Sequence, residues 1–243
     1  MSAPARGLFV TGTDTGVGKT LVSCAVLRAL RRRGRLVGVY KPVETGCPSD
    51  AEGRRYGEDC RRLLAAADTG QPESSVASAL YPIPAAPLVS AEAEHASIDP
   101  DLLVRDFEKL AADYDSVLVE GAGGLLVPIA PAFTYADLAE RLGLPVLVVV
   151  GSRLGCLNHA LLTLAELERR GLRVAGYVLN ALEGGESRPD APHALATHRD
   201  TLSRFCAAAD LGQMPFVAPA ARDDFDALAA AAESQLELAR LPL

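Results

Sequence analysis

The sequence predicts an α/β protein, with a mostly parallel β-sheet flanked by helices. Short apolar runs alternate with longer amphipathic segments through the 243 residues, which is the pattern of successive strand–helix units. A glycine-rich turn joins the first apolar run directly to the first helical segment. No Pro- or Gly-rich linker separates two halves, so we expect a single domain over residues 1–243.

Five segments are predicted strands, because each is a short run of apolar and often β-branched residues bounded by turn residues. Pro42 stops the second strand, and the third ends at Glu120. In chain order the predicted strands are residues 7–11, 36–40, 116–119, 145–150 and 174–179.

Five longer segments have apolar residues at helical spacing, and Gly34 and Gly171 end two of them as C-terminal caps. His193 and His198 are expected to be exposed helix residues. Prolines interrupt residues 68–98, which predicts an irregular stretch, and a loop of that length is typical of a lid or substrate wall. The predicted helices are residues 19–33, 58–67, 101–113, 157–170 and 225–240.

The composition excludes several classes of protein. Hydrophobic residues make up 49% and charged residues 23% of the chain, which is the balance of a folded globular protein. The net charge is −7, and an acidic chain without an extended basic run is a poor binder of nucleic acid or membranes. The longest apolar run, residues 144–150, is far shorter than the ~18 residues of a membrane span. Five cysteines without a CxxC pair, and no signal-like N-terminus, predict a cytoplasmic protein.

The turn after the first strand has the composition of a phosphate-binding loop. It reads Gly12-Thr13-Asp14-Thr15-Gly16-Val17-Gly18-Lys19-Thr20 and lies between a strand and a helix, as this motif requires. Glycines let backbone amides turn toward phosphate oxygens, Lys19 would reach the β- and γ-phosphates, and the Thr20 hydroxyl would bind Mg²⁺. Thr13 departs from the GxxxxGK[ST] pattern, which has glycine there. We interpret the segment as an ATP or GTP site.

Lys41 and Glu120 each follow a predicted strand. Because the carboxyl ends of parallel strands meet at one edge of a sheet, we expect Lys19, Lys41 and Glu120 on the same edge. Glu120 is a candidate Mg²⁺ ligand, with a buried structural carboxylate as the alternative. Lys41 is a candidate partner for a phosphoryl or carboxylate oxygen, with a surface lysine that caps a strand as the alternative.

Two further candidates carry weaker signals. Asp59 could be a second Mg²⁺ ligand, but its spacing does not distinguish it from Asp50 or Glu58, and each could be a solvated loop charge. Cys156 and His159 are three residues apart on a predicted helix and could share a face. Two ligands do not make a zinc site, so a metal pair is the lesser interpretation.

Four segments, in this order along the chain, resemble dethiobiotin synthetase. The first segment shares that family's threonine variant of the phosphate loop, and together the segments extend the resemblance over nearly the whole chain. They are residues 11–20, 40–43, 119–124 and 154–160.

The resemblance implies a P-loop NTPase-like fold whose mostly parallel sheet has seven strands. It also implies a ligase of biotin biosynthesis: 7,8-diaminononanoate, CO₂ and ATP give dethiobiotin, ADP and phosphate through a carbamate and a carbamic-phosphoric anhydride, with Mg²⁺. The family works as a homodimer with active sites at the subunit interface.

The same resemblance assigns roles to residues of this chain. Lys19 and Lys41 would act on the phosphates and carbamate, and Thr45 would contact the substrate. The Mg²⁺ ligands would be Thr20, Asp59 and Glu120. The nucleotide would be bound by Thr13, Gly16, Val17, Gly18, Lys19, Thr20, Leu21, Asp59, Glu120, Gly121, Ala122, Gly123, Asn180, Pro215, Phe216 and Val217. The substrate would be approached from the partner subunit by Gly155, Cys156, Leu157 and Asn158.

Some positions depart from the family's pattern, and two other functions compete. Ala181 stands where aspartate can occur, and Arg222 or Asp223 near a position that can be acidic, so base selectivity stays open. Residues 182–192 could order only with nucleotide bound. The main rival is a partitioning or regulatory P-loop ATPase, but such proteins carry a lysine near the start of the phosphate loop, and Asp14 occupies that neighbourhood here. An amidating synthetase of corrin biosynthesis would need a glutaminase domain, for which we expect no room.

Overall fold

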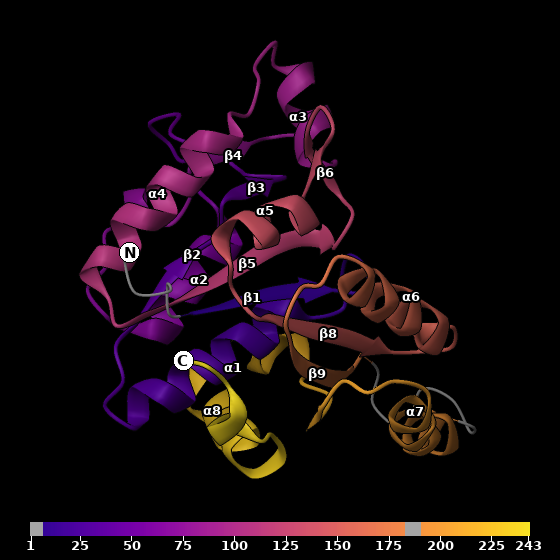
Figure 1. Ribbon diagram of the computed structural model, residues 1–243. Coiled ribbons are helices and arrows are strands. Elements are labelled where there is room, and N and C mark those ends of the chain that lie inside the picture. Colours follow the sequence, from indigo (N-terminus) through magenta and orange to yellow (C-terminus); the bar gives the residue numbers. More distant parts are fainter. Residues whose placement is uncertain (1–6, 183–190) are drawn as a thin grey trace.

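The fold is built around a parallel sheet of six strands (Figure 1). In this computed structural model residues 7–182 and 191–243 are described, without the side chains of residues 191–196. Every pairing between neighbouring strands of this sheet is parallel. In sheet order the strands are β10 (Asp210–Met214), β9 (Val174–Ala181), β8 (Val146–Ser152), β1 (Gly7–Gly12), β5 (Ser116–Gly124) and β2 (Val37–Tyr40).

The central strands are buried on both faces, which is why they read as continuous apolar runs. In β1, Leu8 and Val10 belong to one hydrophobic core and Phe9 to the other, because successive side chains of a strand point to opposite faces. The sheet therefore needs a helical layer on each side.

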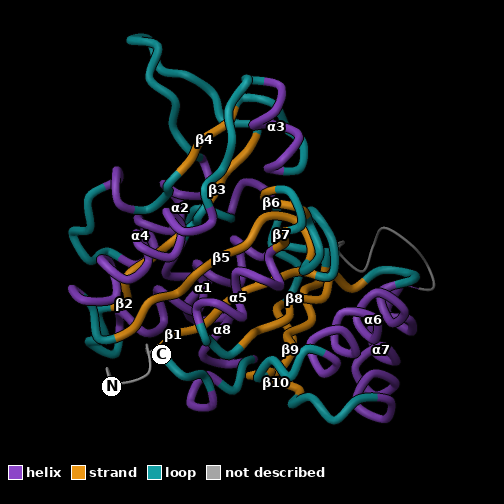
Figure 2. Tube along the Cα trace, turned by 45° about the horizontal axis from the view of Figure 1, so that its top comes forward, coloured by secondary structure: helices purple, strands orange, loops and turns teal. Residues whose placement is uncertain are grey.

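Helices supply both layers (Figures 1 and 2). The core of Leu8 is covered by α1 (Lys19–Arg32), α2 (Glu58–Ala67) and α8 (Phe225–Gln235). The core of Phe9 is covered by α4 (Pro100–Asp113), α5 (Tyr135–Leu142) and α6 (Cys156–Arg169). Two further helices are α7 (Ala191–Phe205), which packs against α6, and α3 (Pro87–Ala93). Single 3₁₀ turns are Glu73–Ser75, Pro219–Ala221 and Leu238–Arg240.

The predicted fold class is confirmed, but the described main sheet has six strands, not seven. Pro42 follows β2 and has no N–H to donate to a neighbouring strand, and the chain leaves the sheet there. The next strand, β3 (Val43–Thr45), pairs with β4 (Ala79–Tyr81) in a separate two-stranded sheet. A second small sheet joins β6 (Pro128–Ala130) to β7 (Phe133–Thr134).

Several elements differ from the sequence prediction. Residues 68–98 are not wholly irregular, because they contain β4 and α3, whose proline stands at the first helical position, where no N–H is needed. The sequence prediction missed β10 and α5, although Thr134 and Asp137 form a capping box at the start of α5. Strand β5 continues past Glu120 to Gly124, which pairs with Gly12.

The C-terminal helix ends at Gln235, five residues earlier than predicted, and a 3₁₀ turn follows. His198 is buried rather than exposed, because α7 packs against α6, and its Nδ1 lies 3.0 Å from the hydroxyl of Ser152. The side chain of His193 and most of the 182–192 segment lie outside the described residues. In the described part of the chain, no helix combines the length and apolar character needed to cross a membrane.

Candidate functional site

The glycine-rich loop after β1 leads directly into α1. Gly16 and Gly18 have φ angles of 74° and 88°, in the left-handed region that glycine enters without strain. Gly18 is the N-cap of α1, so the free amides and the positive dipole end of the helix face the loop. Lys19 is only 7% exposed, and its Nζ donates a hydrogen bond to the carbonyl of Asp14 at 3.3 Å. The predicted phosphate loop therefore has the backbone of an anion-binding turn.

Lys41 lies beside Glu120 because of the strand register. Tyr40, the last residue of β2, pairs with Val119 of β5. The residues that follow them, Lys41 and Glu120, therefore lie side by side. The Lys41 ammonium donates to Oε1 of Glu120 at 2.7 Å and to Oδ2 of Asp59, at the start of α2, at 2.8 Å. The side chains of Lys41 and Glu120 are 3% and 0% exposed, whereas that of Asp59 is 37% exposed. The structure thus brings Asp59 to Lys41 and Glu120, which the sequence analysis expected on the same edge of the sheet.

Helix α1 supplies two hydrogen bonds to the same buried carboxylate. Thr20 Oγ1 donates to Oε1 of Glu120 at 2.9 Å, and Ser23 Oγ donates to Oε2 at 2.6 Å. Glu120 pairs with Val10 inside the sheet, so the carboxylate starts from a rigid strand. Both oxygens are held, and Oε1 is directed toward the Lys41 ammonium.

Burial and neighbouring charges set the protonation of the site. Burial lowers the pKa of Lys19 from 10.5 to about 8, and the like charge of Lys41 adds to the effect. Burial alone would lower the pKa of Lys41 too, but the carboxylates of Glu120 and Asp59 raise it well above its ordinary value. Burial tends to raise the pKa of Asp59, yet Lys41 holds it below its usual value. At neutral pH Lys41 is therefore an ammonium between two carboxylates, and Lys19 is poised to titrate just above neutrality.

A cavity of about 630 Å³ opens at this edge of the sheet. Residues 84–87 form part of its wall, as expected for the long 68–98 segment. The cavity extends from the phosphate loop to the start of α2, to the C-terminal ends of β5 and β9 and to the segment that follows β10. The predicted site residues that line it are Gly16, Gly18, Lys19, Thr20, Leu21, Lys41, Thr45, Asp59, Ala122, Gly123, Asn180 and Val217.

Asn180, on β9, packs against the phosphate loop. Its Nδ2 donates to the carbonyl of Val17 at 3.0 Å, while its buried Oδ1 has no hydrogen-bond partner within the described structure. A Cβ on Gly18 would lie 2.1 Å from that Nδ2, so glycine is needed there for close approach as well as for its φ. A buried acceptor without a partner suits a donor group of a ligand.

The remaining residues predicted to bind nucleotide lie outside the lining of the cavity. Glu120 is buried beneath Lys41 and Thr20, and Val17 belongs to the hydrophobic core. A Cβ on Gly121 would lie 3.2 Å from the ring of Tyr135, so this glycine makes room for packing on the face away from the loop. The others are Thr13, Pro215 and Phe216.

The segment predicted to reach a partner's site begins α6 and does not line this cavity. Gly155 is its N-cap, with a φ of 90° and no side-chain cap, and Asn158 is exposed. Cys156 is buried, whereas His159 is exposed, and a metal pair formed by these two gains no support. Within the described residues no group of three or more His, Cys, Asp or Glu side chains is placed to hold a metal.

Sequence reasoning missed several residues of the site. Ser23 lies three positions after Thr20 on α1, and that helical spacing was a signal for a shared face. Glu44 and Arg62 also line the cavity. Glu44 carried no local signal, because its contact with α2 arises only when β3 folds against that helix.

The oxygen atoms around Lys41 suit a Mg²⁺ ion. The hydroxyl of Thr20 and the carboxylates of Asp59 and Glu120 converge on one place, linked by hydrogen bonds of 2.7–2.9 Å. Hard oxygen donors of this kind, completed by phosphate oxygens, are the preferred surroundings of Mg²⁺. In the described structure the Lys41 ammonium bridges the two carboxylates, so their negative charges are partly offset from within the chain.

The parallel sheet and the glycine-rich loop that carries Lys19 into α1 define a P-loop α/β protein. The sequence profile of the AAA domain matches residues 6–222. A protein of Anaeromyxobacter sp. (strain K), described as an ATP-dependent dethiobiotin synthetase BioD, is 46% identical over 207 residues, which cover 82% of this chain and 88% of that protein. A protein of Aromatoleum aromaticum with the same description is 41% identical over 215 residues, which cover 88% of this chain and 92% of that protein. The chain belongs to the dethiobiotin synthetase family.

Solved structures share the fold at lower sequence identity. The ParA family ATPase from Chlorobium tepidum TLS has a TM-score of 0.51 and 17% identity, covering 95% of this chain and 92% of its own. The MinC:MinD cell division protein complex of Aquifex aeolicus gives a TM-score of 0.52 and 19% identity, covering 93% and 86%. These similarities concern the fold alone.

Proposed function

We propose that this protein is an ATP-dependent dethiobiotin synthetase, which closes a cyclic urea from 7,8-diaminononanoate, CO₂ and ATP and releases ADP and phosphate. The observation that carries the proposal is the placement of two buried lysines, Lys19 and Lys41, on the wall of one cavity beside the phosphate loop, in a chain of this family. The proposed reaction requires the diamine and the triphosphate of ATP to bind in the same cavity.

The reaction needs ATP because oxide is a poor leaving group. An unprotonated amine adds to CO₂ and gives a carbamate and a proton. Transfer of the γ-phosphoryl group to a carbamate oxygen gives a carbamic-phosphoric anhydride and ADP. The second amine, also unprotonated, then attacks the carbonyl carbon, phosphate leaves, the nitrogen releases a proton, and the five-membered ring closes. Holding both nitrogen atoms near one carbon supplies a proximity contribution of roughly several kcal/mol, and no protein nucleophile is required.

The two lysines have different tasks in this proposal. Lys19 donates to the β- and γ-phosphates, and Lys41, which stays protonated, donates to the transferring phosphoryl group or the carbamate. Thr20, Asp59 and Glu120 would hold Mg²⁺, which when bound neutralises phosphate charge. Thr45 lines the same cavity, and its hydroxyl is proposed as a substrate contact.

The nucleotide base bound by this protein is proposed to be adenine, and Asn180 is proposed to contact it. The partnerless Oδ1 of Asn180 would accept a hydrogen bond from the exocyclic amino group, and Val217 lines the same cavity. Arg222 also lines the cavity and is a further candidate for contact with the base. Asn180→Ala should weaken ATP binding more than it weakens inorganic triphosphate binding.

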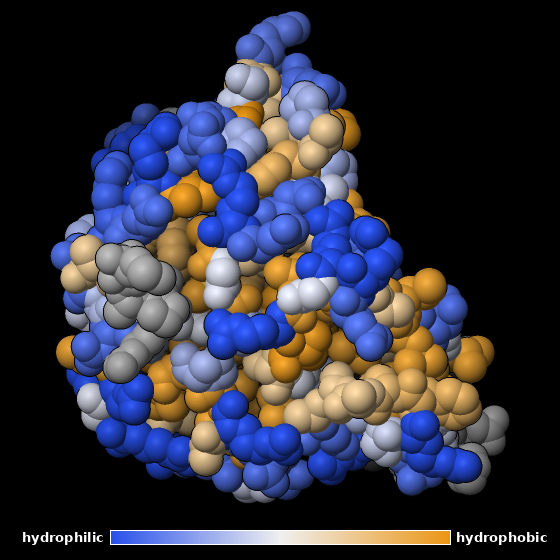
Figure 3. All heavy atoms as spheres, in the orientation of Figure 1, coloured by the Kyte–Doolittle hydropathy of each residue, from blue (hydrophilic) through white to orange (hydrophobic). Residues whose placement is uncertain are grey.

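A homodimer is proposed around α6. Leu154 and Leu162 are 88% and 63% exposed, and hydrophobic residues gather over the α6 region in Figure 3. Burial of such side chains favours association. The segment 155–158 does not line its own subunit's cavity, which supports a role in the partner's. Mixing the inactive variants Lys41→Met and Asn158→Ala should restore part of the activity if sites are shared.

The decisive experiment measures phosphate release with ATP and Mg²⁺, with and without the diamine and bicarbonate. We expect release only when both are present, with one cyclic urea formed per phosphate. Rapid ATP hydrolysis without the diamine, stimulated by DNA or lipid, would instead identify a partitioning or regulatory P-loop ATPase.

A further inference from the structure

Glu44 connects the small β3–β4 sheet to the start of α2. It lies in β3 and is 7% exposed. Its Oε1 accepts the backbone N–H of Asp59 at 3.0 Å, and its Oε2 accepts that of Cys60 at 3.0 Å. One buried carboxylate therefore holds two successive amides of a helix that begins fourteen positions further along the chain.

Helix α2 has no cap of its own. Its N-cap is Gly57, which makes no side-chain hydrogen bond. The amides of Asp59 and Cys60 are those of the second and third helical positions, which an N-cap side chain ordinarily satisfies. Glu44 caps the helix in place of an N-cap side chain, although it lies in a separate strand, β3. Its negative charge suits the positive end of the helix dipole.

Gly57 and Glu44 are matched to each other. A Cβ on Gly57 would lie 2.3 Å from Oε2 of Glu44, so the carboxylate occupies the space of a side chain at the N-cap. The backbone of Gly57 has φ −94° and ψ 123°, which other residues also adopt. Its lack of a side chain is therefore required by Glu44 rather than by the backbone conformation.

We propose that Glu44 is a positioning residue for the Mg²⁺ site: by fixing the first turn of α2 it sets the position of the Asp59 carboxylate relative to Glu120. This rests on the proposed function, in which Asp59 is a Mg²⁺ ligand. The side chain of Asp59 is 37% exposed, against 0% for Glu120, so its position depends more on its backbone. That backbone is the one that Glu44 holds.

The test measures ATP binding by calorimetry at several Mg²⁺ concentrations, without diamine, so that no turnover is involved. In Glu44→Ala, the Mg²⁺ concentration for half-maximal enhancement of ATP binding should rise roughly tenfold, the lower limit for the loss of such a supporting group. Asp59→Asn should have a similar effect, and the double variant should add little, because the two residues act as a unit. Glu44→Gln keeps one acceptor oxygen and should lie between wild type and Glu44→Ala.

The matched control removes a cap elsewhere. Asp99 caps α4 by accepting the N–H of Asp101 at 2.9 Å, so Asp99→Ala should lower the melting temperature without changing the Mg²⁺ dependence of ATP binding.

A second substitution at the start of α2 should reverse the effect of Glu44→Ala. Gly57→Ser should restore the Mg²⁺ dependence in the Glu44→Ala background, because a serine hydroxyl can cap α2 once the carboxylate is gone. In the wild-type background the same change should weaken binding through the collision with Glu44.

The outcomes separate this inference from the proposed function. If wild type shows Mg²⁺-dependent binding that Asp59→Asn loses and Glu44→Ala keeps, the positioning role is wrong and the proposed function stands. If Glu44→Ala leaves the Mg²⁺ dependence of ATP binding unchanged and, in a separate steady-state assay, raises the KM for the diamine, Glu44 is a substrate contact and the inference falls. If wild-type ATP binding does not depend on Mg²⁺, the metal assignment of Asp59 fails, and the positioning role of Glu44 is overturned with it.

Discussion

Lys41 and Glu120 form a buried ion pair, with Nζ of the lysine 2.7 Å from Oε1 of the carboxylate and neither side chain more than 3% exposed. The pair stands between the phosphate loop and the start of α2, because Thr20 and Asp59 bond to its two members. The carboxylate of Glu120 is thus both a candidate metal ligand and one member of a structural ion pair. Substitutions here should affect both stability and turnover.

Glu120→Gln should destabilise the nucleotide-free protein. Removing one member of a buried pair leaves the other charge uncompensated, and because Asp59 still faces Lys41 we expect a loss of about 3 kcal/mol, at the lower end of the range for such changes. Chemical denaturation of the free protein measures it. Glu233→Gln, which weakens a partly exposed pair with Arg32, should cost less than about 1 kcal/mol. Equal losses at both positions would contradict the buried pair.

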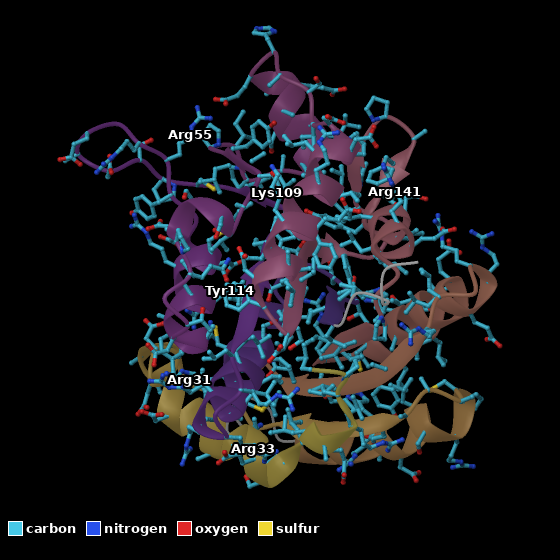
Figure 4. All side chains as sticks on the ribbon, turned by 60° about the vertical axis from the view of Figure 1, so that its left-hand side comes forward. Arg31, Arg33, Arg55, Lys109, Tyr114 and Arg141 are labelled. Carbon is cyan, nitrogen blue, oxygen red and sulfur yellow. The ribbon has the colours of Figure 1, made fainter. Side chains whose placement is uncertain are left out.

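Lys41→Arg should lower turnover by at least about tenfold, or ~1.4 kcal/mol of barrier. A planar guanidinium does not fit the place of a compact ammonium between two carboxylates. Lys109, on α4 (Figure 4), is 75% exposed, so Lys109→Arg should be nearly silent. Steady-state phosphate release compares the two variants, and similar effects would refute a special role for Lys41.

ATP binding should take up a proton above pH 8. The pKa of Lys19 is about 8 in the free protein, and bound phosphate favours the charged form, so this pKa is higher in the complex. Between the two values the complex holds more protons than the free protein, and affinity falls as pH rises. Calorimetry at pH 8.5 in buffers of different ionisation enthalpy measures the uptake.

Arginine at position 19 stays charged throughout this range. The proton uptake should therefore vanish in Lys19→Arg and persist in Lys109→Arg. Uptake that is unchanged in Lys19→Arg would show that another group titrates.

Gly18→Ala should be more damaging than Gly16→Ala. Both glycines have positive φ, so alanine at either costs roughly 1–2 kcal/mol of backbone strain. A Cβ at Gly16 meets nothing within 4 Å, whereas at Gly18 it would lie 2.1 Å from Nδ2 of Asn180. The melting temperature and ATP affinity of Gly18→Ala should therefore fall further. Indistinguishable variants would argue against the packing of Asn180 on the loop.

Much of the fold follows from local sequence patterns. The glycine-rich loop, the apolar strands and the capped helices depend on neighbours within a few residues, so the α/β class and most element positions were predictable. The errors also have local causes: Pro87 reads as a helix breaker but stands at a first helical position, and β10 (Asp210–Met214) lacks the apolar character of a central strand.

The sequence by itself determined the phosphate loop, the alternation of strands and helices, and the edge of the sheet where Lys41 and Glu120 meet. Only the tertiary structure decided which groups touch there. Glu120 is 79 positions from Lys41 and 100 from Thr20, and Glu44 reaches the amides of α2 across an intervening loop. These contacts depend on strand register and on the packing of helices against the sheet, because hydrogen bonds between distant segments form only where folding brings donor and acceptor together.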